Sequence, residues 1–210
     1  MSTEPGSHEF TVATSRDIHI GKVVGLRMDE VVMPDGRTAK REVVEHLGAV
    51  AIAAVDEQQQ VTMVHQYRHA VGKRLWELPA GLLDNAGEAP VTAAARELGE
   101  EAGLAAARWD TLVDVAASPG FTDEVVRVFL ARELSDVPRE VLGEEEADLV
   151  VHRVPMRRAV EMALQGELLN GATVGGVLAA HAVLSGAVSP RPPDAPWRDR
   201  PTAFAARTRG

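Results

Sequence analysis

The sequence predicts an α+β fold, an α/β/α sandwich that follows a small antiparallel β-sheet. A continuous apolar run at residues 49–55 is typical of a strand buried in the middle of a sheet. Residues 91–102 instead repeat apolar side chains at helical spacing, with Pro90 suited to the first turn and Gly103 as a stop. Strands on both sides of this helix, with further helices at the end, indicate a sheet that helices cover.

Four segments are expected along the chain of 210 residues. Residues 1–9 form a flexible N-terminus, and residues 10–47 a sheet with a turn at residues 34–37. Residues 48–186 form the main domain, and residues 187–210 a mobile tail rich in proline and arginine. In the main domain we expect strands at 49–55, 61–66, 74–80, 112–116, 125–130 and 148–154, and helices at 91–102, 156–164 and 173–184.

The composition argues against several classes of protein. Hydrophobic residues make up 45% of the chain and charged residues 25%, which suits a globular protein with a sizeable core. No apolar stretch reaches the roughly 18–20 residues of a membrane span, and the N-terminus lacks the apolar core of a secretory signal, so we expect a cytoplasmic protein without a membrane partner. The absence of cysteine excludes disulfides, a thiolate nucleophile and a cysteine-bound metal. The net charge of −9 argues against a nucleic-acid partner.

Three glutamates gather on the helix predicted at 91–102. Glu97 and Glu101 are one turn apart and Glu100 is three residues after Glu97, so all three project from nearly one face. Carboxylates at this spacing repel one another. A solvated acidic face is the common outcome of such a pattern, and a divalent cation bound by hard oxygen ligands is the functional alternative.

The residues around these glutamates favour the metal site. The chain has Gly81, then six residues, Glu88, seven residues, and the run Arg96-Glu97-Leu98-Gly99-Glu100-Glu101-Ala102-Gly103-Leu104. This pattern resembles the signature of the Nudix hydrolase family and departs from it only in the first spacing, where the family has five residues. The resemblance implies the Nudix fold for the main domain and hydrolysis of a diphosphate.

The resemblance also implies roles for five positions. Glu97 and Glu101 would hold Mg²⁺, or Mn²⁺ as the alternative, and Ala80 would lend its backbone carbonyl to the metal. Glu100 would lie nearby, often with water between, and Arg96 would orient a glutamate. The metal would neutralise the diphosphate and acidify the attacking water.

Two segments outside the signature resemble the ADP-ribose pyrophosphatase branch of the family. Residues 118–124 resemble its proline-marked loop, in which Pro119 and Glu124 would lie at the substrate, with Glu124 near the metals. Gln66-Tyr67-Arg68 resembles its Gln-Tyr-Arg element, which would place the planar guanidinium of Arg68 on the diphosphate. A surface turn and a surface arginine are the alternatives for these two segments.

The same branch implies a general base and a dimer. Residues 143–149 resemble its Glu-Glu-Ala-Asp element, which assigns the base to Glu146, with Glu145 and a merely solvated acidic loop as alternatives. A swapped homodimer is also implied, in which Arg41 contributes at the partner's adenosine.

The predicted function is metal-dependent hydrolysis of a nucleoside diphosphate sugar, ADP-ribose, to AMP and ribose 5-phosphate. GDP-mannose and ADP-glucose stay open as substrates. A catalytically inactive ADP-ribose sensor and a purely structural dimerisation domain are the alternatives from other classes.

Overall fold

The structure is a computed structural model that describes residues 6–139 and 148–208. The chain divides into two compact units, one made of residues 1–48, 116–124 and 200–210 and the other of residues 49–115 and 125–199. The first boundary, between Gly48 and Ala49, lies one residue from the expected division between residues 47 and 48. In the described part of the chain, no helix has both the length and the hydropathy that a membrane crossing requires.

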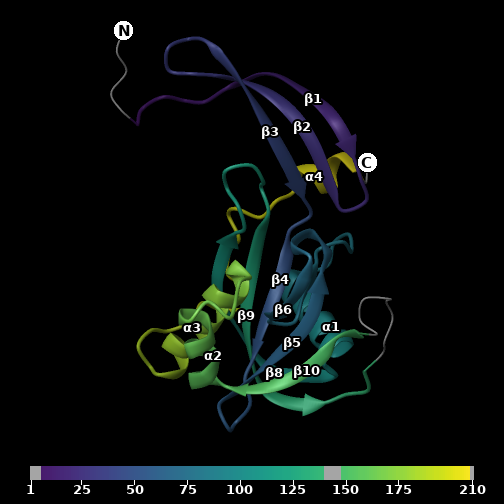
Figure 1. The fold of residues 1–210 in the computed structure, drawn as a ribbon, viewed down its shortest axis with the longest axis vertical. Helices are drawn as coiled ribbons and strands as arrows, with labels where there is room; N and C mark the ends of the chain where they lie inside the picture. Colours follow the sequence, from purple (N-terminus) through teal and green to yellow (C-terminus); the bar gives the residue numbers. More distant parts are fainter. Residues whose placement is uncertain (1–5, 140–147, 209–210) are drawn as a thin grey trace. The chain divides into compact units, whose positions relative to one another are not determined.

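The first unit contains the antiparallel sheet that the sequence predicts. Strands β1 (Val12–Ile20), β2 (Val24–Val32) and β3 (Thr38–His46) pair in that order, and a turn around Gly36 joins β2 to β3 (Figure 1). Strand β1 is an edge strand, and all nine of its residues are exposed. This sheet therefore buries little of its own apolar surface.

The last described residues pack on this sheet instead of forming the mobile tail that the sequence predicts. They form the short helix α4 (Ala203–Thr208), whose Phe204 is fully buried and so close to Gly25 that a Cβ there would lie 2.8 Å from the ring. Arg207 donates to Asp17 over 2.6 Å and also to the buried carboxylate of Glu45. A composition rich in proline and arginine suggests disorder, but Arg207 has two carboxylate partners in the folded unit.

The second unit contains two sheets. The larger has the order β7 (Ala80–Leu82), β4 (Ala49–Ala54), β9 (Val125–Asp136) and β8 (Leu104–Ala116), with β4 antiparallel to β7 and parallel to β9. The smaller has the antiparallel order β10 (Val150–Pro155), β5 (Gln60–Arg68) and β6 (Lys73–Glu77), and the 3₁₀ turn η1 (His69–Val71) joins β5 to β6. Antiparallel and parallel pairing both occur, as expected of an α+β domain.

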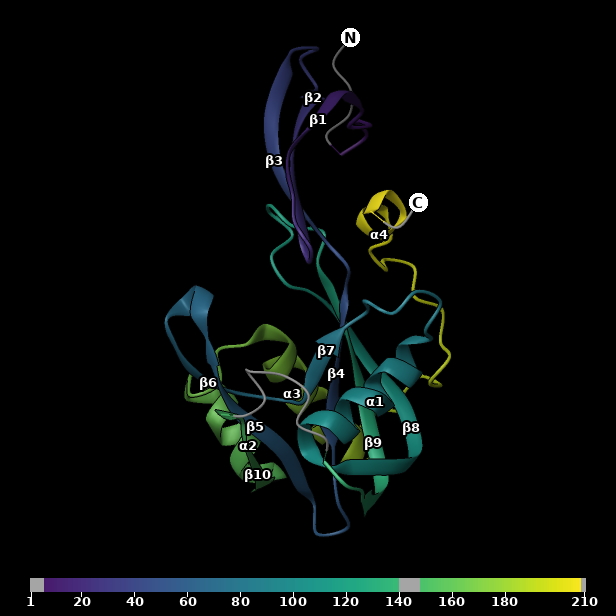
Figure 2. The same cartoon turned by 90° about the vertical axis from the view of Figure 1, so that its right-hand side faces the viewer.

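Helices cover both faces of the larger sheet, as an α/β/α sandwich requires. On one side of β4 lies α1 (Pro90–Ala102), and on the other lie α2 (Met156–Leu164) and α3 (Gly171–Leu184) (Figures 1 and 2). Strand β4 serves both layers: Val50 and Ile52 pack in the α1 core, whereas Ala51 and Ala53 pack in the α2–α3 core. The continuous apolar run of residues 49–55 is explained by this double burial.

Two strands of the second unit differ from their predicted bounds. The single strand expected at 74–80 is two strands, β6 and β7, because Pro79 lies between them and has no N–H to donate. The Pro79 carbonyl still accepts from the Ile52 N–H over 2.8 Å. Strand β8 begins at Leu104, eight residues before the predicted start, because its alanine-rich first half carries no alternating pattern.

The C-terminal segment, residues 191–197, is also ordered by contacts within the second unit. Arg127 on β9 is almost fully buried and donates to both oxygens of Asp114 on β8. The same guanidinium donates to the carbonyls of Ala195 and Pro196 and lies 4.6 Å from the ring centre of Trp197. This stretch, too, was expected to be mobile, and a buried arginine holds it instead.

Candidate active site

Helix α1 carries the glutamates on a rigid base. Pro90 occupies its first turn, and Gly103 ends it with a φ of 65°, a left-handed conformation that glycine adopts readily. The apolar side of the helix buries Ala93, Ala94 and Leu98 against the sheet. The charged side is thereby fixed beside β7, which contacts α1.

Arg96 gathers three glutamates of the signature. Its Nη1 donates to Glu97 over 2.7 Å and to Glu100 over 2.9 Å. Its Nε and Nη2 donate to the two oxygens of Glu88 over 3.2 and 3.3 Å. One guanidinium thus orients three carboxylates, so that an excess of negative charge remains.

The electrostatics of these carboxylates differ. Burial raises the pKa of Glu97, and the charge and hydrogen bond of Arg96 offset this only in part. Hydrogen bonds from Arg96 lower the pKa of Glu88, although its slight burial acts in the opposite direction. A further positive charge nearby would favour the ionised form of Glu97, which burial disfavours.

Glu101 and Ala80 are in direct contact. The Ala80 N–H donates to Glu101 Oε2 over 3.0 Å, and Glu101 is only 7% exposed. Gly81, the next residue, lies against Glu97: a Cβ at this position would be 1.9 Å from Glu97 Cδ. Gly81 is the first residue of the signature pattern, and its close approach to Glu97 is the physical reason that this position requires glycine.

Arg68 lies at the end of β5, as the sequence suggests, and is paired with a residue that sequence analysis missed. Its Nε and Nη2 lie 2.9 and 2.7 Å from Glu77 Oε2, and Glu77 is 2% exposed. Val64 pairs with Glu77 across the β5–β6 hairpin, so Gln66 and Arg68, two and four residues further on, share its face. The strand register was the signal that could have identified Glu77.

Three other predicted site residues belong to the first unit. Arg41 on β3 is exposed, and its Nη1 donates to the Lys40 carbonyl over 2.8 Å. Pro119 lies in a turn in which the Phe121 N–H donates to the Ser118 carbonyl over 3.1 Å. The Glu124 carboxylate lies 3.9 Å from His46 Nδ1. Glu146, with its alternative Glu145, lies outside the described residues.

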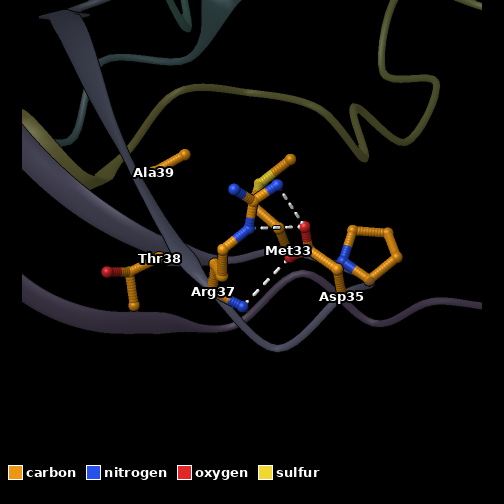
Figure 3. Close-up of a pocket in the computed structure, with 6 residues that line it drawn as sticks. Met33, Asp35, Arg37, Thr38 and Ala39 are labelled. Carbon is orange, nitrogen blue, oxygen red and sulfur yellow. Dashed lines mark hydrogen bonds and ion pairs between the residues drawn. The ribbon is translucent and has the colours of Figure 1, made fainter.

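The first unit also has a pocket at the β2–β3 turn, which contains none of the predicted site residues. Figure 3 shows Arg37 turned toward Asp35, and the two side chains are 2.6 Å apart. Met33, Pro34, Thr38 and Ala39 complete the lining. Because the Arg37 guanidinium is already paired with the Asp35 carboxylate, we do not assign an anion-binding role to this pocket.

The residues at α1 suit a divalent cation by their chemistry, although they are not arranged as a finished metal site. Within residues 6–139 and 148–208, no group of three or more histidine, aspartate or glutamate side chains has a metal-binding arrangement. Glu97 and Glu100 turn to Arg96, and Glu101 accepts from Ala80. Hard carboxylate oxygens with excess negative charge are nevertheless the donors that Mg²⁺ and Mn²⁺ prefer.

Comparisons with known proteins identify relatives over most of the chain. Residues 38–167 match the NUDIX domain. The chain is 53% identical over 200 residues to the ADP-ribose pyrophosphatase of Mycobacterium tuberculosis (strain ATCC 25618 / H37Rv), an alignment that covers 95% of this chain and 97% of that protein. It is 38% identical over 165 residues to the ADP-ribose pyrophosphatase of Bacillus subtilis (strain 168), which covers 79% and 88% of the two chains.

A solved structure shares the fold. A crystal structure of an ADP compounds hydrolase matches with a TM-score of 0.75 at 18% identity and covers 88% of this chain and 98% of that one. The predicted fold class is confirmed by this match and by the two-sided packing around β4.

Proposed function

The chain belongs to the NUDIX domain family, and from this premise we propose that it hydrolyses ADP-ribose to AMP and ribose 5-phosphate. The observation that carries the proposal is the 53% identity, over nearly the whole of both chains, to an ADP-ribose pyrophosphatase. The cluster of glutamates around Arg96 on α1 supports it, because the complete signature from Glu88 onward is retained.

Enzymes of this family depend on a divalent metal ion, and we propose Mg²⁺, with Mn²⁺ as the alternative. Glu97, Glu101 and the Ala80 carbonyl would hold it, with Glu100 nearby. When bound, the ion offsets the charge of the diphosphate and lowers the pKa of the attacking water. The burial that raises the pKa of Glu97 supports this assignment, because a cation favours the ionised carboxylate.

The side chains of this protein would supply the rest of the reaction. Arg96 holds the glutamates in place, and Arg68 binds the diphosphate as negative charge gathers on it. Glu146 takes the proton from the attacking water, with Glu145 as the alternative. Pro119 and Glu124 would contact the substrate.

Selectivity can be tested by measuring kcat/KM for ADP-ribose, ADP-glucose and GDP-mannose under the same conditions. The proposal expects the highest value for ADP-ribose. A higher value for GDP-mannose or ADP-glucose would leave the reaction class in place and reject the substrate. Binding of ADP-ribose with no turnover of any compound would favour the sensor.

Gly81→Ala is expected to impair this reaction because the new methyl group displaces the Glu97 carboxylate. A misplacement of about 1 Å costs on the order of a hundredfold in rate. Overpacking also lowers the free energy of unfolding, by about 1–3 kcal/mol. Steady-state kinetics and urea unfolding of the purified variant measure the two effects. Wild-type kinetics would refute the role given to Gly81.

We further propose a homodimer that forms through the first unit, in which Arg41 of the partner subunit reaches the adenosine. Residues 10–24, which include strand β1, expose several apolar side chains. Their exposed fractions are 63% for Phe10, 54% for Val12, 45% for Ile18, 52% for Ile20 and 38% for Val24. An exposed edge strand with apolar side chains is a surface on which another chain pairs.

Replacing Phe10 and Ile20 together by lysine is expected to convert the dimer to a monomer. Two buried charges at the interface would be costly, whereas the isolated chain already exposes both positions. Light scattering measures the mass directly. Leu164→Lys, at a position 75% exposed on α2, is the control that should leave the mass unchanged. A monomeric wild type, or a double variant that stays dimeric, would rule out this interface.

A further inference from the structure

A buried carboxylate, Glu77, lies beneath the arginine that the proposed function assigns to the diphosphate. Arg68 Nε and Nη2 both reach Glu77 Oε2, over 2.9 and 2.7 Å. The Glu77 side chain is 2% exposed and that of Arg68 is 38% exposed. One end of this ion pair is therefore enclosed in the protein and the other faces solvent.

Glu77 is itself fixed from two other elements. Gln66 Nε2, on β5, donates to Glu77 Oε2 over 2.9 Å. Asn170 Nδ2 donates to Glu77 Oε1 over 2.9 Å, and Asn170 also caps α3 by accepting from the Thr173 N–H over 3.0 Å. Both carboxylate oxygens of Glu77 thus have donors, which holds the carboxylate in one orientation.

This arrangement leaves part of the Arg68 guanidinium for a ligand. A guanidinium has about five N–H bonds in a rigid plane, and Glu77 takes one edge of it. Because the plane is rigid, fixing the Nε–Nη2 edge also fixes the direction of Nη1. Phosphate oxygens accept hydrogen bonds from guanidinium N–H groups, and a guanidinium that is already oriented can bind them without first ordering a flexible side chain.

We propose that Glu77 is the positioning residue of Arg68, which it orients toward the diphosphate of the substrate. The inference rests on the proposed function, because the diphosphate is the ligand that Arg68 binds. Glu77 acts only through Arg68 and touches no reacting atom. A merely structural Glu77 would also stabilise the fold, so the test must separate affinity from stability.

The test is a double-mutant cycle of Glu77→Gln and Arg68→Ala, measured as KM, kcat and kcat/KM for ADP-ribose. Glutamine keeps the shape of Glu77 but cannot accept from all of its donors. We expect Glu77→Gln to raise KM about tenfold in the wild-type background, with kcat changed by less than about threefold. In the Arg68→Ala background the same change should alter kcat/KM by less than about twofold. Equal effects in both backgrounds would overturn the proposal.

Arg68→Lys keeps the inference testable if Glu77→Gln does not fold. Lysine retains the charge at a partly exposed position, but an ammonium group cannot hold Glu77 with one edge and present another. We expect Arg68→Lys to raise KM for ADP-ribose by most of the increase that Arg68→Ala causes. Wild-type KM in Arg68→Lys would show that orientation by Glu77 does not matter.

Asp114→Asn is the matched control, because it also removes a carboxylate paired with an arginine in the second unit. It should lower the thermal midpoint while KM stays within about twofold of wild type, and an equal rise in KM would show that lost stability alone explains Glu77→Gln. If the wild type turns over a different nucleoside diphosphate sugar, the proposed substrate fails and the cycle is repeated with that compound. If nothing is turned over, the proposed function fails. The same double-mutant cycle is then measured as the dissociation constant of ADP-ribose by calorimetry.

Discussion

Glu101→Gln is expected to lower kcat/KM for ADP-ribose by about a thousandfold while the protein stays folded. Electrostatic stabilisation by a bound metal is worth several kcal/mol in the transition state, and glutamine removes one of the charges that would hold the ion. The glutamine carbonyl can still accept the Ala80 N–H that now donates over 3.0 Å to Glu101. The loss should therefore appear in activity and far less in the free energy of unfolding.

Steady-state kinetics over a range of Mg²⁺ concentrations measure this effect, and urea unfolding measures stability. Glu161→Gln is the matched control, because Glu161 is a glutamate on α2 of the same unit that pairs with the exposed Arg157 in an i,i+4 contact. It should change neither quantity appreciably. Activity of Glu101→Gln within about tenfold of wild type would contradict the metal role of Glu101.

Arg127→Ala is expected to produce the largest loss of stability, about 3–5 kcal/mol in the free energy of unfolding of the second unit. The change leaves Asp114 without its buried partner and removes the donor to the Ala195 and Pro196 carbonyls. All three tryptophans of the chain, at positions 76, 109 and 197, lie in the second unit, so tryptophan fluorescence reports its unfolding. The midpoint is compared rather than the amplitude, because Arg127 contacts Trp197.

Arg191→Ala is the control for this prediction. Arg191 also donates to Asp114 over 3.0 Å, but its side chain is 41% exposed, so we expect a loss of at most about 1 kcal/mol. Equal effects of the two substitutions, or a loss below about 1 kcal/mol for Arg127→Ala, would contradict the importance given to burial.

The pH dependence provides a further check on the Arg127 pair. Burial alone would raise the pKa of Asp114, but hydrogen bonds from Arg127 and Arg191 outweigh it and place the pKa below the ordinary value. A lowered pKa in the folded state stabilises the fold above the unfolded pKa of about 3.9, and this stability is lost as the pH falls through the folded pKa. The difference between wild type and Arg127→Ala should therefore shrink below about pH 4.

Local patterns were enough to predict much of the fold. The double burial of β4 leaves a continuous apolar run, and α1 has a helical period, a proline at its start and a glycine at its end. The order of residues 187–208 could not be predicted in this way. It depends on Arg127 and Arg207 meeting partners that are distant in sequence, such as Ala195 for the first and Asp17 for the second.

The same distinction applies to the site. The sequence alone predicted the spacing of Glu97, Glu100 and Glu101 on one helix. In the structure Glu97 and Glu100 accept hydrogen bonds from Arg96. The roles of Gly81 and Glu77 depend on neighbours that local sequence does not give: α1 packs Glu97 against Gly81 on β7, and the pairing of β5 with β6 brings Arg68 to Glu77. The metal roles, the base Glu146 and the substrate contacts of Pro119, Glu124 and Arg41 remain predictions.

The central claim is tested most directly by chromatography of the products formed from ADP-ribose, with Mg²⁺ and with a chelator, for the wild type and for Glu101→Gln. The account predicts that AMP and ribose 5-phosphate appear in equal amounts from the wild type with Mg²⁺. It predicts neither product with the chelator and almost none from the variant. Intact ADP-ribose after incubation of the wild type with Mg²⁺, or equal turnover by the variant, would contradict it.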